Sequence, residues 1–279
     1  MNNKIAVVLE FRSDNDFLSK FKAAVDMGIT SCQLSIWNEY VYSDEYAEIV
    51  KAAAEETGME ISAVWAGWEG PCEWNFKYGP STIGLVPQSY RADRVKTLKK
   101  AGDFAAKIGV NRIISHAGFI PENPMEENFS GTVGALRDVC RYLKKKNICF
   151  LFETGQETPI TMLRTIQAIS MDNVGINFDT ANLILYGKGN PLDALDVFGK
   201  YVMDTHIKDG LYPTEGMSLG REVFVGEGKA NVPEIIKKLN SYGYTGNFTI
   251  EREIYGEQQQ KDIAATKELI INWMADASI

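Results

Sequence analysis

The stretch ICFLFETGQETPITMLRTIQAISMDNVGINFDTANL, residues 148–183, decides the fold class. Its segments 148–154 and 173–179 are short apolar runs of strand-like composition, bounded by turn-forming residues. The longer segment between them is helix-like, with apolar residues at helical spacing. A strand, a helix and a second strand in this order predict two parallel strands joined by a crossover helix.

The same unit recurs along the whole chain of 279 residues. Strand-like runs are predicted at residues 5–10, 32–37, 61–67, 111–118, 148–154, 173–179, 201–209 and 247–253. Helix-like segments lie between them, and four of these segments end at a glycine: Gly28, Gly58, Gly109 and Gly243. Eight units of about 35 residues match a closed barrel better than an open doubly wound sheet. We therefore predict an α/β fold, a single (β/α)8 TIM barrel.

Length and composition fit one domain over residues 1–279. Hydrophobic residues make up 45% of the chain, enough for a large core, and barrels of about 250 residues form single domains. Two connections are long, at about 68–89 and 210–232. Both follow a predicted strand, so we expect them on the C-terminal face, where barrels build their active sites.

Charge and composition argue against several classes of protein. Lys and Arg number 29 against 37 Asp and Glu, so the net charge of −8 lacks the basic excess of a nucleic-acid-binding protein. No apolar run approaches the roughly 18 residues of a membrane span, and the first residues lack a signal peptide's apolar core. The four cysteines form no CxxC pair, which favours reduced thiols. We expect a cytoplasmic protein with neither nucleic-acid nor membrane partner. Because homo-oligomers are common among such barrels, self-association is also expected.

Reactive side chains in a barrel project from the C-terminal ends of the strands. The sequence places candidates near five such ends: His116, Glu153, Asp179, His206 and Glu251. Because the chain has only two histidines, metal chemistry must rely on carboxylates. Oxygen ligands with one nitrogen suit Mn²⁺, Mg²⁺, Co²⁺ or Zn²⁺. Each residue alone could cap a helix or pack in the core. One metal site is nevertheless favoured, because four of them lie on consecutive strands: Glu153, Asp179, His206 and Glu251.

Three further polar residues are candidate substrate contacts. His116 could hydrogen-bond a substrate hydroxyl or Glu153, or only pack in the barrel. Lys208 shares the inward face of its strand with His206, so it could polarise a carbonyl, neutralise an anionic substrate or pair with a surplus carboxylate. Glu157 is a weaker candidate for a hydroxyl or phosphate contact. The chain has no GxxxxGK loop, so nucleotide binding is not indicated.

Tryptophans gather after the second and third predicted strands: Trp37, Trp65, Trp68 and Trp74. Flat aromatic faces pack against the C–H faces of sugars, but tryptophans at a barrel end also serve as plain packing or as oligomer contacts. We expect at least one of them to stack on a sugar, and we select Trp65 as the candidate.

Five motifs between residues 148 and 253 carry a resemblance: LFETGQE, GINFDTANL, DTHIKDG, VGEGKANV and FTIERE. Their order and spacing resemble the xylose-isomerase-like barrel superfamily of sugar isomerases and epimerases. The resemblance covers essentially the whole barrel and implies one divalent metal ion held by Glu153, Asp179, His206 and Glu251. In the ketose 3-epimerase and inosose-processing branches, the two glutamates also flank the substrate as acid–base residues.

The same superfamily contains an abasic-site endonuclease branch, which needs several zinc ions and more histidines than the two of this chain. Asn182 stands three residues after Asp179, where both the nucleases and the ketose 3-epimerases have histidine. Tyr212 stands where the 3-epimerases have a substrate-binding arginine. In the 3-epimerases the residues at both positions contact the substrate, so we expect Asn182 to contact it here. Because both residues differ from the 3-epimerase pattern, ketose 3-epimerase specificity is not implied.

These residues and the resemblance predict a divalent-metal-dependent isomerase or epimerase of a small keto-sugar or related polyhydroxy carbonyl compound. A proton next to a carbonyl is too weakly acidic for an ordinary carboxylate to remove, so a metal-stabilised enediolate is expected. Glu153 and Glu251 on opposite faces would invert the carbon centre. Two alternatives stay open: a metal-dependent dehydratase of an inosose-like substrate, and a catalytically silent sugar-binding barrel.

Overall fold

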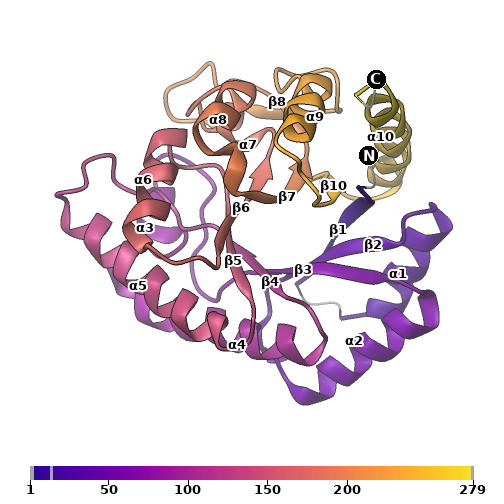
Figure 1. Ribbon diagram of the computed structural model, residues 1–279, viewed down its shortest axis with the longest axis horizontal. Coiled ribbons are helices and arrows are strands. Elements are labelled where there is room, and N and C mark those ends of the chain that lie inside the picture. The colour runs from indigo at the N-terminus through magenta and orange to yellow at the C-terminus, as the bar shows by residue number, and fades with distance from the viewer. Residues whose placement is uncertain (1–2, 13–14, 278–279) are drawn as a thin grey trace.

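The computed structural model describes residues 3–12 and 15–277, in which eight parallel strands close into a barrel surrounded by helices (Figure 1). The barrel strands are β1 (Ile5–Phe11), β2 (Ser31–Ile36), β3 (Glu60–Ala66), β4 (Arg112–Ser115), β5 (Cys149–Glu153), β6 (Val174–Asp179), β7 (Val202–Ile207) and β10 (Phe248–Ile250). Each pairs with its neighbours in sequence, and β10 closes the barrel on β1. The predicted single (β/α)8 barrel is confirmed.

A long helix follows each barrel strand and packs outside the barrel (Figure 1). These helices are α1 (Phe17–Asp26), α2 (Asp44–Thr57), α4 (Gln88–Lys107), α5 (Glu127–Lys144), α6 (Pro159–Ile169), α8 (Pro191–Phe198), α9 (Val232–Ser241) and α10 (Glu257–Asp276). Short helical turns add α3 (Gly79–Thr82), α7 (Asn182–Leu185), η1 (Glu39–Val41) and η2 (Gly199–Tyr201). Gly58 ends α2 in the left-handed region, with φ of 68°, as its position in the sequence predicted.

Side chains along each strand point alternately into the barrel interior and outward, into the layer beneath the helices. In β5, Phe150 and Phe152 belong to the large core that includes Leu136 and Leu143 of α5. Leu151, on the opposite face, packs with residues of the smaller cluster inside the barrel. Successive side chains of a strand point to opposite faces, so the last residue of β5 also faces the interior.

The two long connections have ordered structure of their own. The first, between β3 and α4, contains α3. The second contains an antiparallel hairpin of β8 (Asp209–Leu211) and β9 (Arg221–Val223), which the sequence analysis did not predict. Asp209 is 2% exposed, and its carboxylate accepts hydrogen bonds from the backbone N–H groups of Gly226, Gly228 and Ala230 at 3.0, 2.9 and 2.9 Å. This residue therefore fastens the segment after the hairpin.

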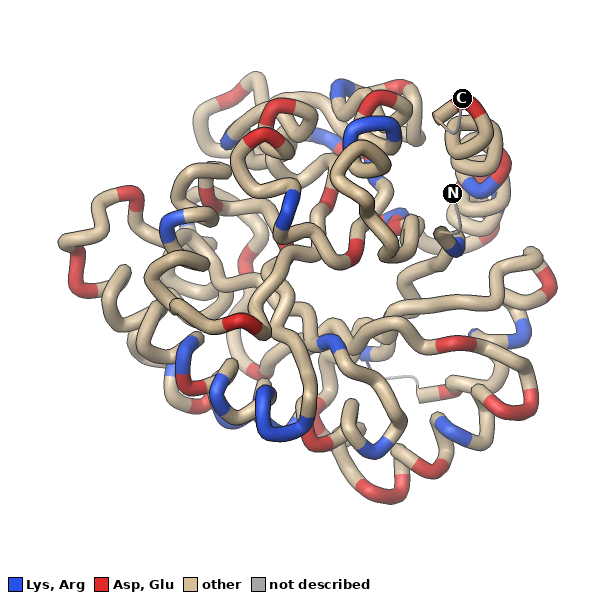
Figure 2. The backbone as a smooth tube through the Cα atoms, viewed as in Figure 1, with Lys and Arg blue, Asp and Glu red and all other residues tan. Residues whose placement is uncertain are grey.

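Acidic and basic residues alternate along the outer helices (Figure 2). Several pair along one helix, such as Lys237 with Glu234 and Lys261 with Glu257. The four cysteines are free thiols, as expected from their spacing. No helix in the described part of the chain combines the length and apolarity that crossing a bilayer requires.

Candidate metal centre and active site

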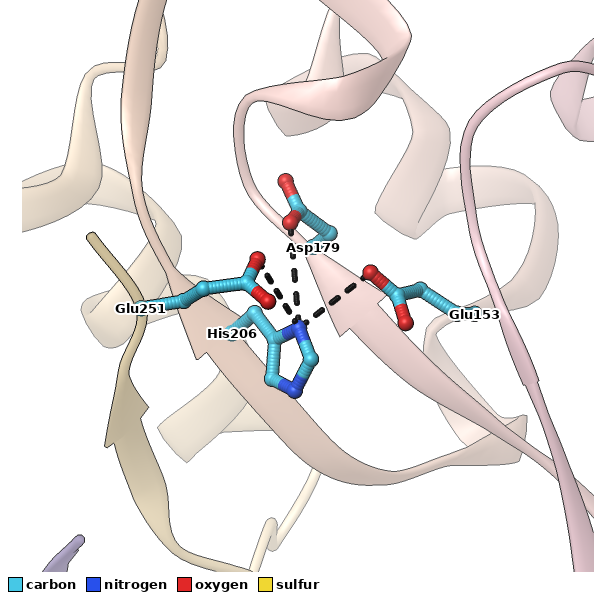
Figure 3. A group of neighbouring side chains, drawn as sticks. All are labelled: Glu153, Asp179, His206 and Glu251. Atoms are coloured by element: carbon cyan, nitrogen blue, oxygen red, sulfur yellow. Dashed lines mark ion pairs between the residues drawn. The ribbon is translucent and has the colours of Figure 1, made fainter. Parts of the chain in front are cut away.

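The four predicted ligands converge at the C-terminal end of the barrel (Figure 3). Glu153 ends β5, Asp179 ends β6, His206 is the penultimate residue of β7, and Glu251 directly follows β10. One ligand atom of each lies within 4.8 Å of the others. His206 Nδ1 is 3.2 Å from Glu153 Oε1, 3.2 Å from Glu251 Oε2 and 3.8 Å from Asp179 Oδ2. Three carboxylates thus surround one imidazole nitrogen.

The four side chains of this group are largely buried. Asp179 and His206 are fully buried, Glu153 is 3% exposed, and the side chain of Glu251 is 16% exposed. Like charges this close repel one another, and burial weakens the screening by solvent. Burial raises the pKa of Asp179 to about 8, against the opposing charge of Lys208. A divalent cation would supply the positive charge that these carboxylates lack.

Lys208 is 1% exposed and pairs with two of the candidate ligands. Its Nζ lies 3.0 Å from Asp179 Oδ2 and 2.7 Å from Glu251 Oε2, and it also lies 3.2 Å from Glu253 Oε2. The lysine stands two residues after His206, on the inward face that the sequence predicted. One ammonium group therefore lies within ion-pair distance of three carboxyl groups.

Two buried ligand atoms make ion-pair contacts but no hydrogen bond of good geometry among the described residues: His206 Nδ1 and Asp179 Oδ2. Buried polar atoms are nearly always hydrogen-bonded, so such atoms call for an explanation. Both belong to the same group, and the donor set of three carboxylates and one imidazole suits a divalent ion. The residues present therefore fit a metal ion.

For each of the two glutamates, burial and the neighbouring charges shift the pKa in opposite directions. Burial acts to raise the pKa of Glu251, but His206 and Lys208 outweigh it and hold this pKa well below its usual range. Burial also acts to raise the pKa of Glu153, but His116 and His206 outweigh it and lower the pKa. Both glutamates are thus ionised at neutral pH, the state in which a carboxylate can bind a metal ion or accept a proton.

Three predicted substrate contacts surround Glu153. The indole Nε1 of Trp65 donates a hydrogen bond to Glu153 Oε2, a role that the sequence analysis did not assign. Asn182 Nδ2 donates to Glu153 Oε1 at 3.3 Å, and His116 Nε2 lies 3.6 Å from the same oxygen. Both carboxylate oxygens are therefore held in place from the neighbouring strands and loops.

The site opens into a cavity of about 570 Å³, within the range of pockets that hold small ligands. Its lining includes Glu153, Glu251, His116, Asn182 and the aromatic residues Trp37, Trp65, Trp74 and Tyr186. The tryptophans contact one another, with ring centroids 4.9 Å apart for Trp37 and Trp65. The predicted tryptophan group thus lies together at the barrel mouth.

Lys208 and Glu157 are not among the residues that line this cavity. Glu157 is 2% exposed, and its Oε1 accepts a hydrogen bond from the backbone N–H of Gly155 at 3.3 Å. Its Oε2 has no hydrogen-bond partner in the described part of the chain. Burial raises the pKa of Glu157 to about 8, so this carboxyl is largely protonated at neutral pH.

Sequence reasoning missed two residues near the site, Gln33 and Tyr186. Gln33 is fully buried, and its Oε1 lies 2.7 Å from His206 Nε2. Tyr186 is 5% exposed, lines the cavity, and has a hydroxyl without a hydrogen-bond partner among the described residues. A usable signal existed for Gln33, because it is an uncharged polar residue inside the otherwise apolar run CQLSIW.

The model of the xylose isomerase-like TIM barrel family matches residues 21–273. The chain belongs to this family. The resemblance inferred from the five motifs is therefore confirmed. A member of known structure, the xylose isomerase domain protein from Planctomyces limnophilus, is 30% identical to this chain. The match covers 98% of this chain and 97% of that one, with a TM-score of 0.89.

More distant relatives of this xylose isomerase-like barrel share less of its sequence. A D-tagatose 3-epimerase-like protein is 18% identical, with 99% of this chain and 98% of that one covered and a TM-score of 0.74, which shows the common fold alone. An uncharacterised protein of Methanocaldococcus jannaschii is 24% identical over 194 residues. That match spans 64% of this chain and only 62% of the relative.

Proposed function

We propose that this protein is a divalent-metal-dependent isomerase or epimerase of a small keto-sugar or a related polyhydroxy carbonyl compound. The observation that carries the proposal is the position of Glu153 and Glu251, each 3.2 Å from His206 Nδ1 and each at the wall of the cavity. The proposed class of reaction is compatible with the fold, because a protein named as D-tagatose 3-epimerase-like shares it.

Glu153, Asp179, His206 and Glu251 would hold one divalent ion, with Mn²⁺, Co²⁺, Zn²⁺ and Mg²⁺ as candidates. When bound, such an ion polarises a carbonyl and stabilises the negative charge that develops when the adjacent carbon loses a proton. All other parts of the chemistry fall to the side chains of the cavity.

The two glutamates are the proposed acid–base pair. Removal of a proton by one and its return by the other, from the opposite side, inverts the carbon centre and gives epimerisation. Return of the proton to the neighbouring carbon gives aldose–ketose isomerisation instead. Glu251 is available to accept a proton because Lys208 and His206 keep it ionised, and Glu153 is oriented by Trp65 and Asn182.

The remaining cavity residues bind and orient the substrate in this proposal. His116 and Asn182 offer polar atoms to sugar hydroxyls, and the tryptophan group, with Trp65, offers flat faces for C–H groups. Lys208 acts through Glu251, which it contacts at 2.7 Å, and offsets part of the negative charge of the site.

The proposal is tested by incubating the protein with Mn²⁺ and a panel of ketopentoses and ketohexoses in D₂O. An isomerase or epimerase incorporates deuterium at the carbon next to the carbonyl, which mass spectrometry and NMR detect. A dehydratase instead builds an ultraviolet-absorbing enone. A silent binder shows ligand-dependent thermal stabilisation without exchange.

The variant Glu251→Gln should lose deuterium exchange by at least about a hundredfold, because a general base contributes 10²–10⁴ in rate. The matched control is Glu227→Gln, an exposed glutamate on the loop after the hairpin. Full exchange in Glu251→Gln would contradict the acid–base assignment, and loss of exchange in both variants would point to a general defect.

A further inference from the structure

We propose that a hydrogen-bond chain of fixed polarity, from Arg112 through Asp204, Thr249 and Gln33, holds His206 in the tautomer whose proton is on Nε2. Gln33 is then a positioning residue for His206, acting from the opposite wall of the barrel interior. Only the purpose of this tautomer, which is to present Nδ1 to a metal ion, rests on the proposed function.

Gln33 connects three strands inside the barrel. It lies in β2 and is fully buried, as are His206 of β7, Asn177 of β6 and Thr249 of β10. Gln33 Oε1 lies 2.7 Å from His206 Nε2, while Gln33 Nε2 donates to Asn177 Oδ1 at 3.2 Å and to Thr249 Oγ1 at 3.3 Å. An amide can be turned by 180°, so these contacts alone do not fix the proton on the imidazole.

The direction of the hydrogen bonds is set at the far end of the chain. Arg112 Nη1 donates to Asp204 Oδ2 at 3.2 Å, and an arginine side chain has donors only. Asp204 Oδ1 accepts the hydroxyl proton of Thr249 at 3.3 Å. Because this is the only proton that the hydroxyl has, Thr249 Oγ1 can only accept from Gln33. The NH₂ group of Gln33 must therefore face Thr249.

The consequence for His206 follows directly. With its NH₂ group facing Thr249, Gln33 presents its carbonyl oxygen to His206 Nε2, and an oxygen can only accept. His206 Nε2 therefore carries a proton, and Nδ1 of the neutral ring has its lone pair toward Glu153 and Glu251. The other tautomer would place an N–H among the ligands, where it would exclude a metal ion.

Two substitutions separate this role from plain packing. Gln33→Met keeps the volume of the side chain and removes the acceptor. Gln33→Glu keeps an acceptor, and Asn177 Nδ2, which has no hydrogen-bond partner among the described residues, could turn to donate to the new carboxylate. The matched control is Ser31→Ala. Ser31 lies on the same strand as Gln33, and the substitution removes a buried hydrogen bond that Asn247 donates to it, without changing a contact of His206.

The first readout is the affinity for Mn²⁺, measured by isothermal titration calorimetry on protein whose fold is checked by circular dichroism. Gln33→Met should bind Mn²⁺ at least about tenfold more weakly, the usual effect of losing a partner of a ligating histidine. Gln33→Glu and Ser31→Ala should stay near the wild-type affinity. Equal affinity of Gln33→Met and wild type would overturn the inference.

The second readout is the tautomer itself, from long-range ¹H–¹⁵N correlation spectra of the Zn²⁺-loaded protein labelled at histidine. The chain has two histidines, so a His116→Asn variant assigns the signals. Wild type should show a protonated Nε2 on His206. A protonated Nδ1 would contradict the inference regardless of any activity.

Thr249→Val provides a second variant should Gln33→Met fail to fold. It leaves Gln33 and His206 in place but removes the hydroxyl that sets the direction of the chain. We expect a mixture of tautomers in the metal-free protein at alkaline pH and a weaker affinity for Mn²⁺. A single tautomer with wild-type affinity would contradict the fixed polarity.

The failure of this inference and that of the proposed function have different signatures. A wild-type protein that binds none of Mn²⁺, Co²⁺, Zn²⁺ or Mg²⁺ contradicts the proposed function, while the tautomer can still be determined at alkaline pH. A wild-type protein that binds the ion no better than Gln33→Met contradicts only the role of Gln33.

Discussion

Lys208 Nζ lies 2.7 Å from Glu251 Oε2 inside the barrel, and the lysine is 1% exposed. A buried ammonium group holds one of the two proposed acid–base residues and also contacts Asp179 at 3.0 Å. Removing one partner of a buried ion pair leaves an uncompensated charge, which is far more costly than losing a pair at the surface. The pair therefore couples the stability of the barrel to the charge of its site.

We expect Lys208→Met to lower the free energy of unfolding of the metal-free protein by about 3–5 kcal/mol. Added Mn²⁺ should recover part of this loss, because an ion would compensate the same carboxylates. Urea unfolding with and without Mn²⁺ measures both effects. The control is Lys237→Met, whose solvent-exposed pair with Glu234 should contribute little to the free energy of unfolding. A metal-free Lys208→Met protein as stable as wild type would contradict this account.

Trp65→Phe should lower kcat by about 10- to 100-fold while KM stays near its wild-type value. The phenyl ring keeps an aromatic face, but it loses the indole N–H that donates to Glu153, and a hydrogen bond to a charged group contributes about 1.5–3 kcal/mol. Steady-state kinetics on an identified ketose checks this split, with Trp273→Phe in α10, which is not among the residues lining the cavity, as the control. A rise in KM alone would assign Trp65 to substrate stacking instead.

Glu157 should make the protein less stable as the pH rises. Its pKa in the folded protein is about 8, against about 4.3 in an unfolded chain, so between these values the folded state holds a proton that the unfolded state has lost. The free energy of unfolding should fall by up to about 1.4 kcal/mol per pH unit in this window from this group alone.

Glu157→Gln should remove that dependence, since the amide does not titrate. Urea unfolding of metal-free protein at pH 5, 6, 7 and 8 should therefore give a flatter profile for Glu157→Gln than for wild type. Glu227→Gln, an exposed glutamate, should follow wild type. Parallel profiles of Glu157→Gln and wild type would show that Glu157 is ionised in the folded protein.

Asp209→Asn should loosen the segment after the β8–β9 hairpin. Its carboxylate accepts from four backbone N–H groups, three of them in the segment 226–230, and an amide offers one acceptor oxygen in place of two. Amide hydrogen exchange, followed by mass spectrometry, should become faster in residues 224–230 and stay unchanged in α4 and α5. Unchanged exchange in 224–230 would show that other contacts hold this segment.

The barrel and the convergence of the four candidate ligands could be predicted because both depend on local patterns. Strand runs, helical spacing and glycine stops repeat along the sequence, and Glu153, Asp179 and His206 each stand at a predicted strand end. The hairpin of β8 and β9 was missed because strands of three residues give no periodicity.

The partners of the ligands could not be predicted from such patterns. Gln33 meets His206 across the barrel at a separation of 173 residues, and Trp65 meets Glu153 at a separation of 88. Both contacts depend on which inward side chains share a layer of the closed barrel. Periodicity indicates that Trp65 faces inward, but only the three-dimensional structure shows that its N–H group holds a carboxylate.

The most direct test of the central claim is the number of divalent ions bound per chain, measured by equilibrium dialysis against Mn²⁺ with wild type and His206→Ala. The four-ligand group predicts one ion per chain in wild type and none at the same concentration in the variant. No bound ion in wild type, or equal binding by His206→Ala, would contradict a metal-dependent site at Glu153, Asp179, His206 and Glu251.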